Sequence, residues 1–103
     1  MTWHAAAKVE DIRAGEIVAS AVGAENIALY RIEGRIYATS NVCTHAFALL
    51  SDGYLDGDCV ECPIHQALFH VPTGEVLGAP ATEPLKTYAA KIEGDTVFVD
   101  VPD

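Results

Sequence analysis

Apolar positions dominate both faces of residues 26–40, NIALYRIEGRIYATS, where Ile27, Leu29 and Arg31 alternate with Ala28, Tyr30 and Ile32 in the pattern of a β-strand. After this strand, Glu33-Gly34 offers a tight reversal of the chain. No part of the sequence sustains a helical period through three turns. The pattern therefore predicts a hairpin here and an all-β protein as a whole.

A second hairpin is predicted over residues 88–101, YAAKIEGDTVFVDV, with its turn at Glu93-Gly94-Asp95. Side chains two residues apart in a strand share one face of it. The last strand should therefore line the core with three valines: Val97, Val99 and Val101. We expect the aromatic residues Trp3 and Tyr30 to belong to the core as well.

Residues 41–82, between the two hairpins, have a different character. Turn sequences rich in Gly, Pro and Asp divide this segment into short apolar pieces. No linker, charged block or low-complexity tract separates it from the rest of the chain. We therefore expect a single domain over residues 1–103, in which residues 41–82 are an excursion from a small antiparallel β-barrel or sandwich.

Length and charge limit the possible classes of protein. With 103 residues, half of them apolar, the chain can build one core without disulfides. Its formal charge of −9 disfavours binding to nucleic acids or anionic membranes and favours a partner with a basic docking face, although solubility alone explains an acidic surface equally well. The sequence has no long apolar run and no leader-like start, which predicts a cytoplasmic location.

Two Cys/His pairs lie in the segment between the hairpins. Cys43 and His45 form a C-x-H pair, and Cys62 and His65 form a C-P-I-H pair. A cysteine sulfur lies closer to the backbone than an imidazole nitrogen does. Two such loops brought together can therefore hold one metal through two thiolates and a second, more outward metal through two imidazoles. Pro63 stiffens the second loop.

This C-x-H and C-x-x-H pattern resembles that of the Rieske [2Fe–2S] proteins, in which two histidines replace two cysteines on one iron. Residues 28–101 resemble the ferredoxin component of bacterial aromatic-ring-hydroxylating dioxygenase systems in three further motifs: S-D-G-x-L-x-G, H-Q-x-x-F and T-G-x-x-x-x-x-P. The resemblance implies the Rieske fold, an antiparallel β-barrel-like base with an inserted cluster-binding subdomain.

The resemblance also implies the roles of individual residues. Cys43 and Cys62 would bind the inner iron of one [2Fe–2S] cluster, and His45 and His65 would bind the outer iron. We expect the two imidazoles to be the docking and exit point for the electron as well. Pro80, in the family's third loop, is a candidate shield of the cluster against water.

The function that the resemblance implies is that of a soluble, monomeric one-electron carrier without catalytic activity of its own. It would take electrons from a flavin-containing ferredoxin reductase and pass them to a terminal oxygenase. The alternative is a Rieske-fold or zinc-stabilised small subunit fixed in a larger oxidoreductase complex.

The expected reduction potential follows from four positions. Respiratory Rieske proteins have two bridged cysteines where this chain has Ala48 and Ile64, and they have Ser and Tyr hydroxyls where it has Ala67 and Phe69. With fewer hydrogen bonds to the cluster sulfurs, the reduced cluster is less stabilised. We expect a potential towards the lower end of the Rieske range, about −150 mV.

Other readings of the same residue types remain open. A structural zinc ion also takes two cysteines and two histidines, although a C-x-H arm is uncommon in such sites. Cys59 forms C-V-E-C with Cys62, and we expect it to be a strand residue that behaves as a small buried hydrophobe. We expect His4 and His70 to be packing or surface residues.

Four carboxylates lie between the two Cys/His pairs. They could help a basic partner to dock, but a solvated loop explains them at least as well. They are Asp52, Asp56, Asp58 and Glu61.

Overall fold

The computed structural model describes residues 2–44, 48–64, 66–79 and 81–102. This part of the chain is nearly all β, as predicted, with two one-turn 3₁₀ helices, η1 (Val9–Asp11) and η2 (Leu50–Asp52). None of it forms a helix that is long and apolar enough to span a membrane. The strands are β1 (Thr2–Lys8), β2 (Ile17–Val22), β3 (Glu25–Ile32), β4 (Arg35–Ser40), β5 (Tyr54–Asp56), β6 (Cys59–Glu61), β7 (Leu68–His70), β8 (Val76–Gly78), β9 (Thr87–Tyr88), β10 (Ala90–Glu93) and β11 (Thr96–Val101).

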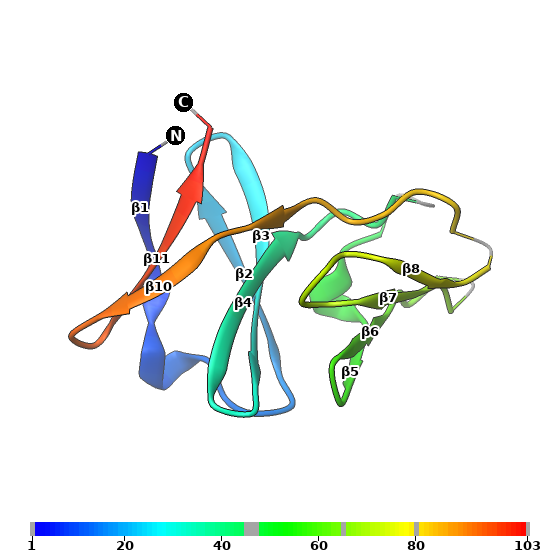
Figure 1. Ribbon diagram of the computed structural model, residues 1–103, viewed down its shortest axis with the longest axis horizontal. Coiled ribbons are helices and arrows are strands. Elements are labelled where there is room, and N and C mark those ends of the chain that lie inside the picture. Colours follow the sequence, from blue (N-terminus) through cyan, green and yellow to red (C-terminus); the bar gives the residue numbers. More distant parts are fainter. Residues whose placement is uncertain (1, 45–47, 65, 80, 103) are drawn as a thin grey trace.

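Two antiparallel sheets form the base of the molecule, with strand orders β1-β11-β10 and β2-β3-β4-β9 (Figure 1). They enclose an aliphatic core in which every residue is at most 2% exposed. The predicted valines of the last strand all belong to it. The core consists of Ile12, Val22, Ile27, Leu29, Ala38, Val97, Val99 and Val101.

The hairpin predicted from the alternating pattern is confirmed as β3 and β4. Ile32 pairs with Arg35, which leaves Glu33-Gly34 as a two-residue turn. Both turn residues have positive φ, 51° and 78°. This is the requirement of a type I′ turn, and Gly34 meets it without steric cost.

The C-terminal hairpin is confirmed as β10 and β11, with a turn one residue shorter than predicted. Glu93 pairs with Thr96, so only Gly94 and Asp95 remain unpaired at the turn. Gly94 has a φ of 62°. The alternation of β11 holds throughout, because its three valines are fully buried while the residues between them are only half-buried.

The central strand β3 is buried on both faces. Ile27 and Leu29 face the core of the base, whereas Ala28 and Tyr30 belong to a second core. The Tyr30 hydroxyl and the Thr39 hydroxyl are hydrogen bonded at 2.8 Å, and burial raises the pKa of Tyr30 to about 12. β3 therefore joins the base to the part of the molecule that packs on its other face.

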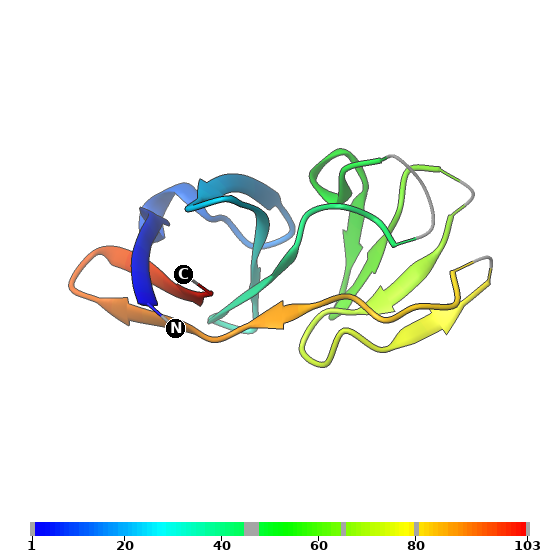
Figure 2. The same cartoon turned by 90° about the horizontal axis from the view of Figure 1, so that it is seen from above.

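A third sheet, with strand order β5-β6-β7-β8, lies beside the base (Figure 1). We call residues 41–85 the insert, because the Ser40 backbone N–H donates a hydrogen bond to the Lys86 carbonyl at 2.8 Å and so closes the segment between them. Figure 2 shows the chain running through β9 to β10 along one side of the molecule, from the insert back to the base.

The expectation that Trp3 belongs to the core is wrong. β1 is an edge strand, and Trp3 is 41% exposed on it. The Lys91 ammonium lies 4.4 Å from the centre of its ring. The indole is therefore held at the surface by a cation–π contact rather than by burial.

Candidate metal centre

Cys43 and Cys62 come together in the second core, where the insert packs on β3. Cys43 is only 4% exposed and Cys62 is fully buried, and neither forms a disulfide. The two thiols are near enough to interact, because Cys43 contributes to the raised pKa of Cys62. The sequence prediction that these two cysteines share one site is consistent with this geometry.

Each of the two cysteines begins a closed loop of the same length. The Cys43 backbone N–H donates to the Ala48 carbonyl at 3.0 Å, and the Cys62 N–H donates to the Ala67 carbonyl at 2.8 Å. The residues that flank each hydrogen bond are also paired. Val42 forms an antiparallel bridge with Leu49, and β6 pairs with β7. Each cysteine therefore begins a six-residue segment that is closed by the same kind of backbone hydrogen bond.

The chemistry of the two thiols fits a metal. Burial raises the pKa of Cys62 to about 11, and the neighbouring Cys43 thiol contributes to the increase. Two thiolates this close in an apolar core need a compensating positive charge. A metal ion bound by both sulfurs supplies this charge, so the donor set matches a thiolate-bound metal.

The other two predicted ligands, His45 and His65, lie outside the described residues, as does Pro80. In the part of the chain that the structure describes, no three His, Cys, Asp or Glu side chains gather closely enough to hold a metal ion. Cys43 and Cys62 are thus the two predicted ligands whose positions are described.

Thr44 is a residue of the site that the sequence analysis did not single out. Its hydroxyl donates a hydrogen bond to the Glu83 carbonyl at 2.8 Å. Ala81 and Leu85, on either side of Glu83, are buried in the same core as the two thiols. The first loop is therefore fastened to the chain segment before β9. A hydroxyl residue between Cys43 and its neighbouring histidine was the signal in the sequence.

The prediction for Cys59 is half correct. Cys59 is a strand residue, in β6, but it is half-buried on the outer face of the sheet instead of in the core. Its thiol donates to Asp58 at 3.4 Å, and burial is the main cause of the raised pKa of Cys59. β6 alternates, and it is Val60 that points inward.

His70 is a half-buried surface residue, in agreement with the prediction. Its Nε2 lies 3.0 Å from an Asp58 oxygen, and its Nδ1 lies 2.8 Å from the Thr73 hydroxyl. The hydrogen bond from His70 is the main reason why the pKa of Asp58 is lowered. These contacts connect the β5–β6 turn to the β7–β8 turn, at the end of the third sheet opposite Cys62.

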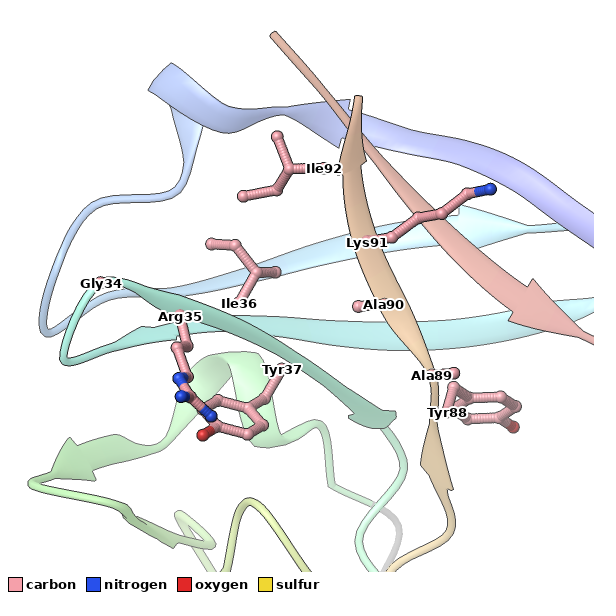
Figure 3. Close-up of a pocket in the computed structure, with 9 residues that line it drawn as sticks. All are labelled: Gly34, Arg35, Ile36, Tyr37, Tyr88, Ala89, Ala90, Lys91 and Ile92. Carbon is pink, nitrogen blue, oxygen red and sulfur yellow. The ribbon is translucent and has the colours of Figure 1, made fainter. Parts of the chain in front are cut away.

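A hollow of about 480 Å³ lies in the base, between β4 and β10. The side chains of Ile36 and Ile92 lie across this gap, whereas Arg35 and Tyr37 point to the other side of β4 (Figure 3). Neither cysteine of the candidate centre lines it. The hollow is thus separate from the metal centre.

Comparison of the chain with known protein families and proteins agrees with this chemistry. The family model described as the Rieske [2Fe-2S] domain matches residues 2–89. The ferredoxin component of the naphthalene 1,2-dioxygenase system of Pseudomonas putida is 48% identical over 99 residues, which are 96% of this chain and 95% of that protein.

Solved structures give the same result. The Sphingomonas yanoikuyae B1 ferredoxin superposes with a TM-score of 0.93 at 36% identity, covering 98% of this chain and 100% of that one. A second match comes from a complex of reduced oxygenase and oxidized ferredoxin in carbazole 1,9a-dioxygenase. It is 39% identical with a TM-score of 0.87, and it covers 94% of this chain and 91% of that chain.

The family match decides between the two metals that the sequence left open, in favour of iron and sulfide over zinc. The relatives are named as ferredoxin components, and such components carry electrons without being the catalytic oxygenase. The chain belongs to the Rieske [2Fe–2S] family, as an electron-carrying ferredoxin with one Rieske-type cluster.

Proposed function

We propose that Cys43 and Cys62 bind one iron of the cluster and that His45 and His65 bind the other. The placement of both cysteines in one buried core and the matching backbone hydrogen bonds that follow them support this assignment. The spacing of each histidine from its cysteine supports it as well. The single domain of residues 1–103 would then carry its cluster in a subdomain of about residues 41–82.

The bound cluster supplies one-electron chemistry, and the protein sets the conditions for it. Two thiolates, in place of four, leave less negative charge around the irons, so the site accepts an electron more readily. The apolar side chains of Ala67 and Phe69 are fully buried in the core that holds the thiols and keep water from that side. The histidine side of the cluster would be the side that meets partner proteins.

In this proposal the protein takes electrons from a flavin-containing reductase and delivers them to the terminal oxygenase of an aromatic-ring-hydroxylating dioxygenase system. The observation that carries it is the near full-length identity of 48% to the ferredoxin component of the naphthalene 1,2-dioxygenase system. The carbazole dioxygenase complex supports an oxygenase as acceptor, because a similar ferredoxin is bound there. We further propose that the protein acts in the cytoplasm as a monomer.

Metal analysis and spectroscopy of the purified protein test the ligand assignment. The protein should be reddish brown, contain about two irons per chain, and lose its visible absorption on reduction with dithionite. His45→Ala and His65→Ala should each lose this absorption, whereas Cys59→Ala should keep it. Loss of the cluster in Cys59→Ala, or its retention in both histidine variants, would contradict the assignment.

Reconstitution tests the place in the electron-transfer chain. Mixing the protein with a reductase and a terminal oxygenase of the naphthalene system should give product at a rate that rises with ferredoxin concentration. A chain that carries the cluster but leaves the rate at its background value would contradict this part of the proposal.

A further inference from the structure

Charge is distributed unequally between the two parts of the molecule. The insert, residues 41–85, contains six Asp and Glu residues and no Lys or Arg, so all six cationic side chains of the protein lie in the base. Only one of the six carboxylates, that of Asp58, forms an ion pair within the described residues, and its partner is His70. Apart from His70 at Asp58, the described part of the insert offers its carboxylates no ion-pair partner, so the insert presents a negative potential.

The outer face of the β5–β8 sheet carries part of this charge. Leu55, Val60 and Phe69 point inward to the second core. Since side chains alternate along a strand, their neighbours in β5 and β6 point outward. Tyr54 pairs with Glu61 across the two strands, and Asp56 lies two residues further on the same face.

Apolar side chains are exposed on the same face. Tyr54 is 66% exposed and Leu77 is 48% exposed, which are the two largest exposures among the large apolar residues of the described chain. Leu77 lies at a register irregularity in the pairing of β7 with β8, next to Val76, which packs against the second core. An exposed aromatic residue with carboxylates beside it has the composition of a protein interface, in which a Tyr anchor is surrounded by a charged rim.

The face is also placed next to the metal loops. β6 ends at Glu61, directly before Cys62, and β7 begins at Leu68, directly after the closing residue Ala67. A protein that covers the outer face of the sheet therefore lies beside the loop that Cys62 begins. Opposite charges would draw such a protein in and orient it before contact.

We propose that the outer face of the β5–β8 sheet, centred on Tyr54 with Asp56 and Glu61 beside it, docks a one-electron partner protein whose surface presents Lys and Arg around an apolar recess. The proposal rests on the proposed function, because it extends the partner contact from the histidine end of the insert along this sheet. The negative insert favours this occupant over a second copy of the same chain, which would bring like charges together.

Cytochrome c, a cationic one-electron acceptor, is a suitable probe. Stopped-flow kinetics measure the second-order rate at which the reduced protein reduces it, from low to high salt. Asp56→Lys should slow this reaction at least fivefold at low salt, and the effect should vanish at high salt. The matched control is Glu16→Lys, which makes the same change of charge at an exposed position of the base. It should slow the reaction less than twofold.

Cross-linking locates the contact. A zero-length carbodiimide joins carboxylates to lysines that touch them, and peptide mapping of the product should identify Asp56 or Glu61. Tyr54→Ser should lower the yield of this product, whereas Ile92→Ser, at a residue that is 46% exposed on the base, should not. Equal slowing in Asp56→Lys and Glu16→Lys, or cross-links at carboxylates of the base, would overturn the proposal.

Iron content and bleaching by dithionite are measured first for each protein. A wild-type chain without iron would contradict the proposed function. An iron-loaded chain whose reaction is indifferent to Asp56→Lys would contradict only the docking face.

Discussion

The base and the insert hold their strands together by different means. The five principal strands of the base have six to eight residues and enclose a wholly aliphatic core. Each strand of the insert has three residues, and the core beneath them includes the thiols of Cys43 and Cys62. The base is thus stabilised by burial and long pairing, whereas the insert depends on its contact with β3 and on what its thiols bind.

This difference has a thermodynamic meaning. Three-residue strands are too short to be stable by themselves, and metal binding to a site formed only in the folded chain contributes directly to folding. The cluster should therefore stabilise the insert much more than the base.

Cys62→Ser should separate the two parts most strongly. The variant should contain no iron, because a buried hydroxyl cannot replace the thiolate. Amide hydrogen exchange should become fast in β6 and β7 and stay slow in β3. Cys59→Ser is the matched control and should keep both its iron and its protection. Equal loss of protection in the base and the insert would show that they unfold as one unit.

Val99→Ala tests the base alone. Val99 is fully buried in the aliphatic core, and the variant should lower the free energy of unfolding by about 2 kcal/mol. Urea unfolding followed by circular dichroism measures this loss. The reduction potential should not change. Leu77→Ala, at an exposed position of the insert, should stay within about 0.5 kcal/mol of the wild type. A shifted potential in Val99→Ala would contradict the separation.

Ala67→Ser tests the expected low potential of about −150 mV. Ala67 is fully buried beside the thiols, and a hydroxyl there should stabilise the reduced cluster by a hydrogen bond to sulfur. If this bond favours the reduced state by about 1.4 kcal/mol, the potential rises by about 60 mV. Redox titration gives the value. Ala38→Ser, which places a hydroxyl in the core of the base, should leave the potential unchanged.

Thr44→Val tests the link between the first loop and the segment before β9. Losing the hydrogen bond to the Glu83 carbonyl should cost about 1 kcal/mol, which corresponds to about fivefold faster release of iron to a chelator. Thr44→Ser should restore the slow release, because it keeps the hydroxyl. Unfolding of the base should be the same in all three proteins. A slow release in Thr44→Val would show that the hydrogen bond does not hold the loop.

The sequence predicted the base well where alternation is long. The β3–β4 hairpin follows from a fifteen-residue run of strand-forming residues and from its Glu33-Gly34 turn. β1 has no such signal, because its sequence TWHAAAK does not alternate, and it is fixed by pairing with β11 at the other end of the chain. Trp3 was misplaced for the same reason.

In the insert, the motifs predicted the chemistry and the pattern predicted little of the sheet. Strands of three residues are too short to show a period of two, so the side that Cys59 faces could not be read from the sequence. Cys43 and Cys62 were identified from their spacing to the two histidines. The contact of Thr44 with Glu83 joins residues 39 positions apart, a separation that no local pattern encodes.

The hydrogen bond between Ser40 and Lys86 has a consequence for how such molecules can diversify. The chain leaves the base at Ser40 and returns to it at Lys86, at nearly the same point. The insert is therefore attached to the base as one continuous module. An insert with other loop chemistry could be joined at these two positions, provided that it also covers Ala28 and Tyr30 of β3. The reduction potential and the choice of partner could thereby vary while the base stays the same.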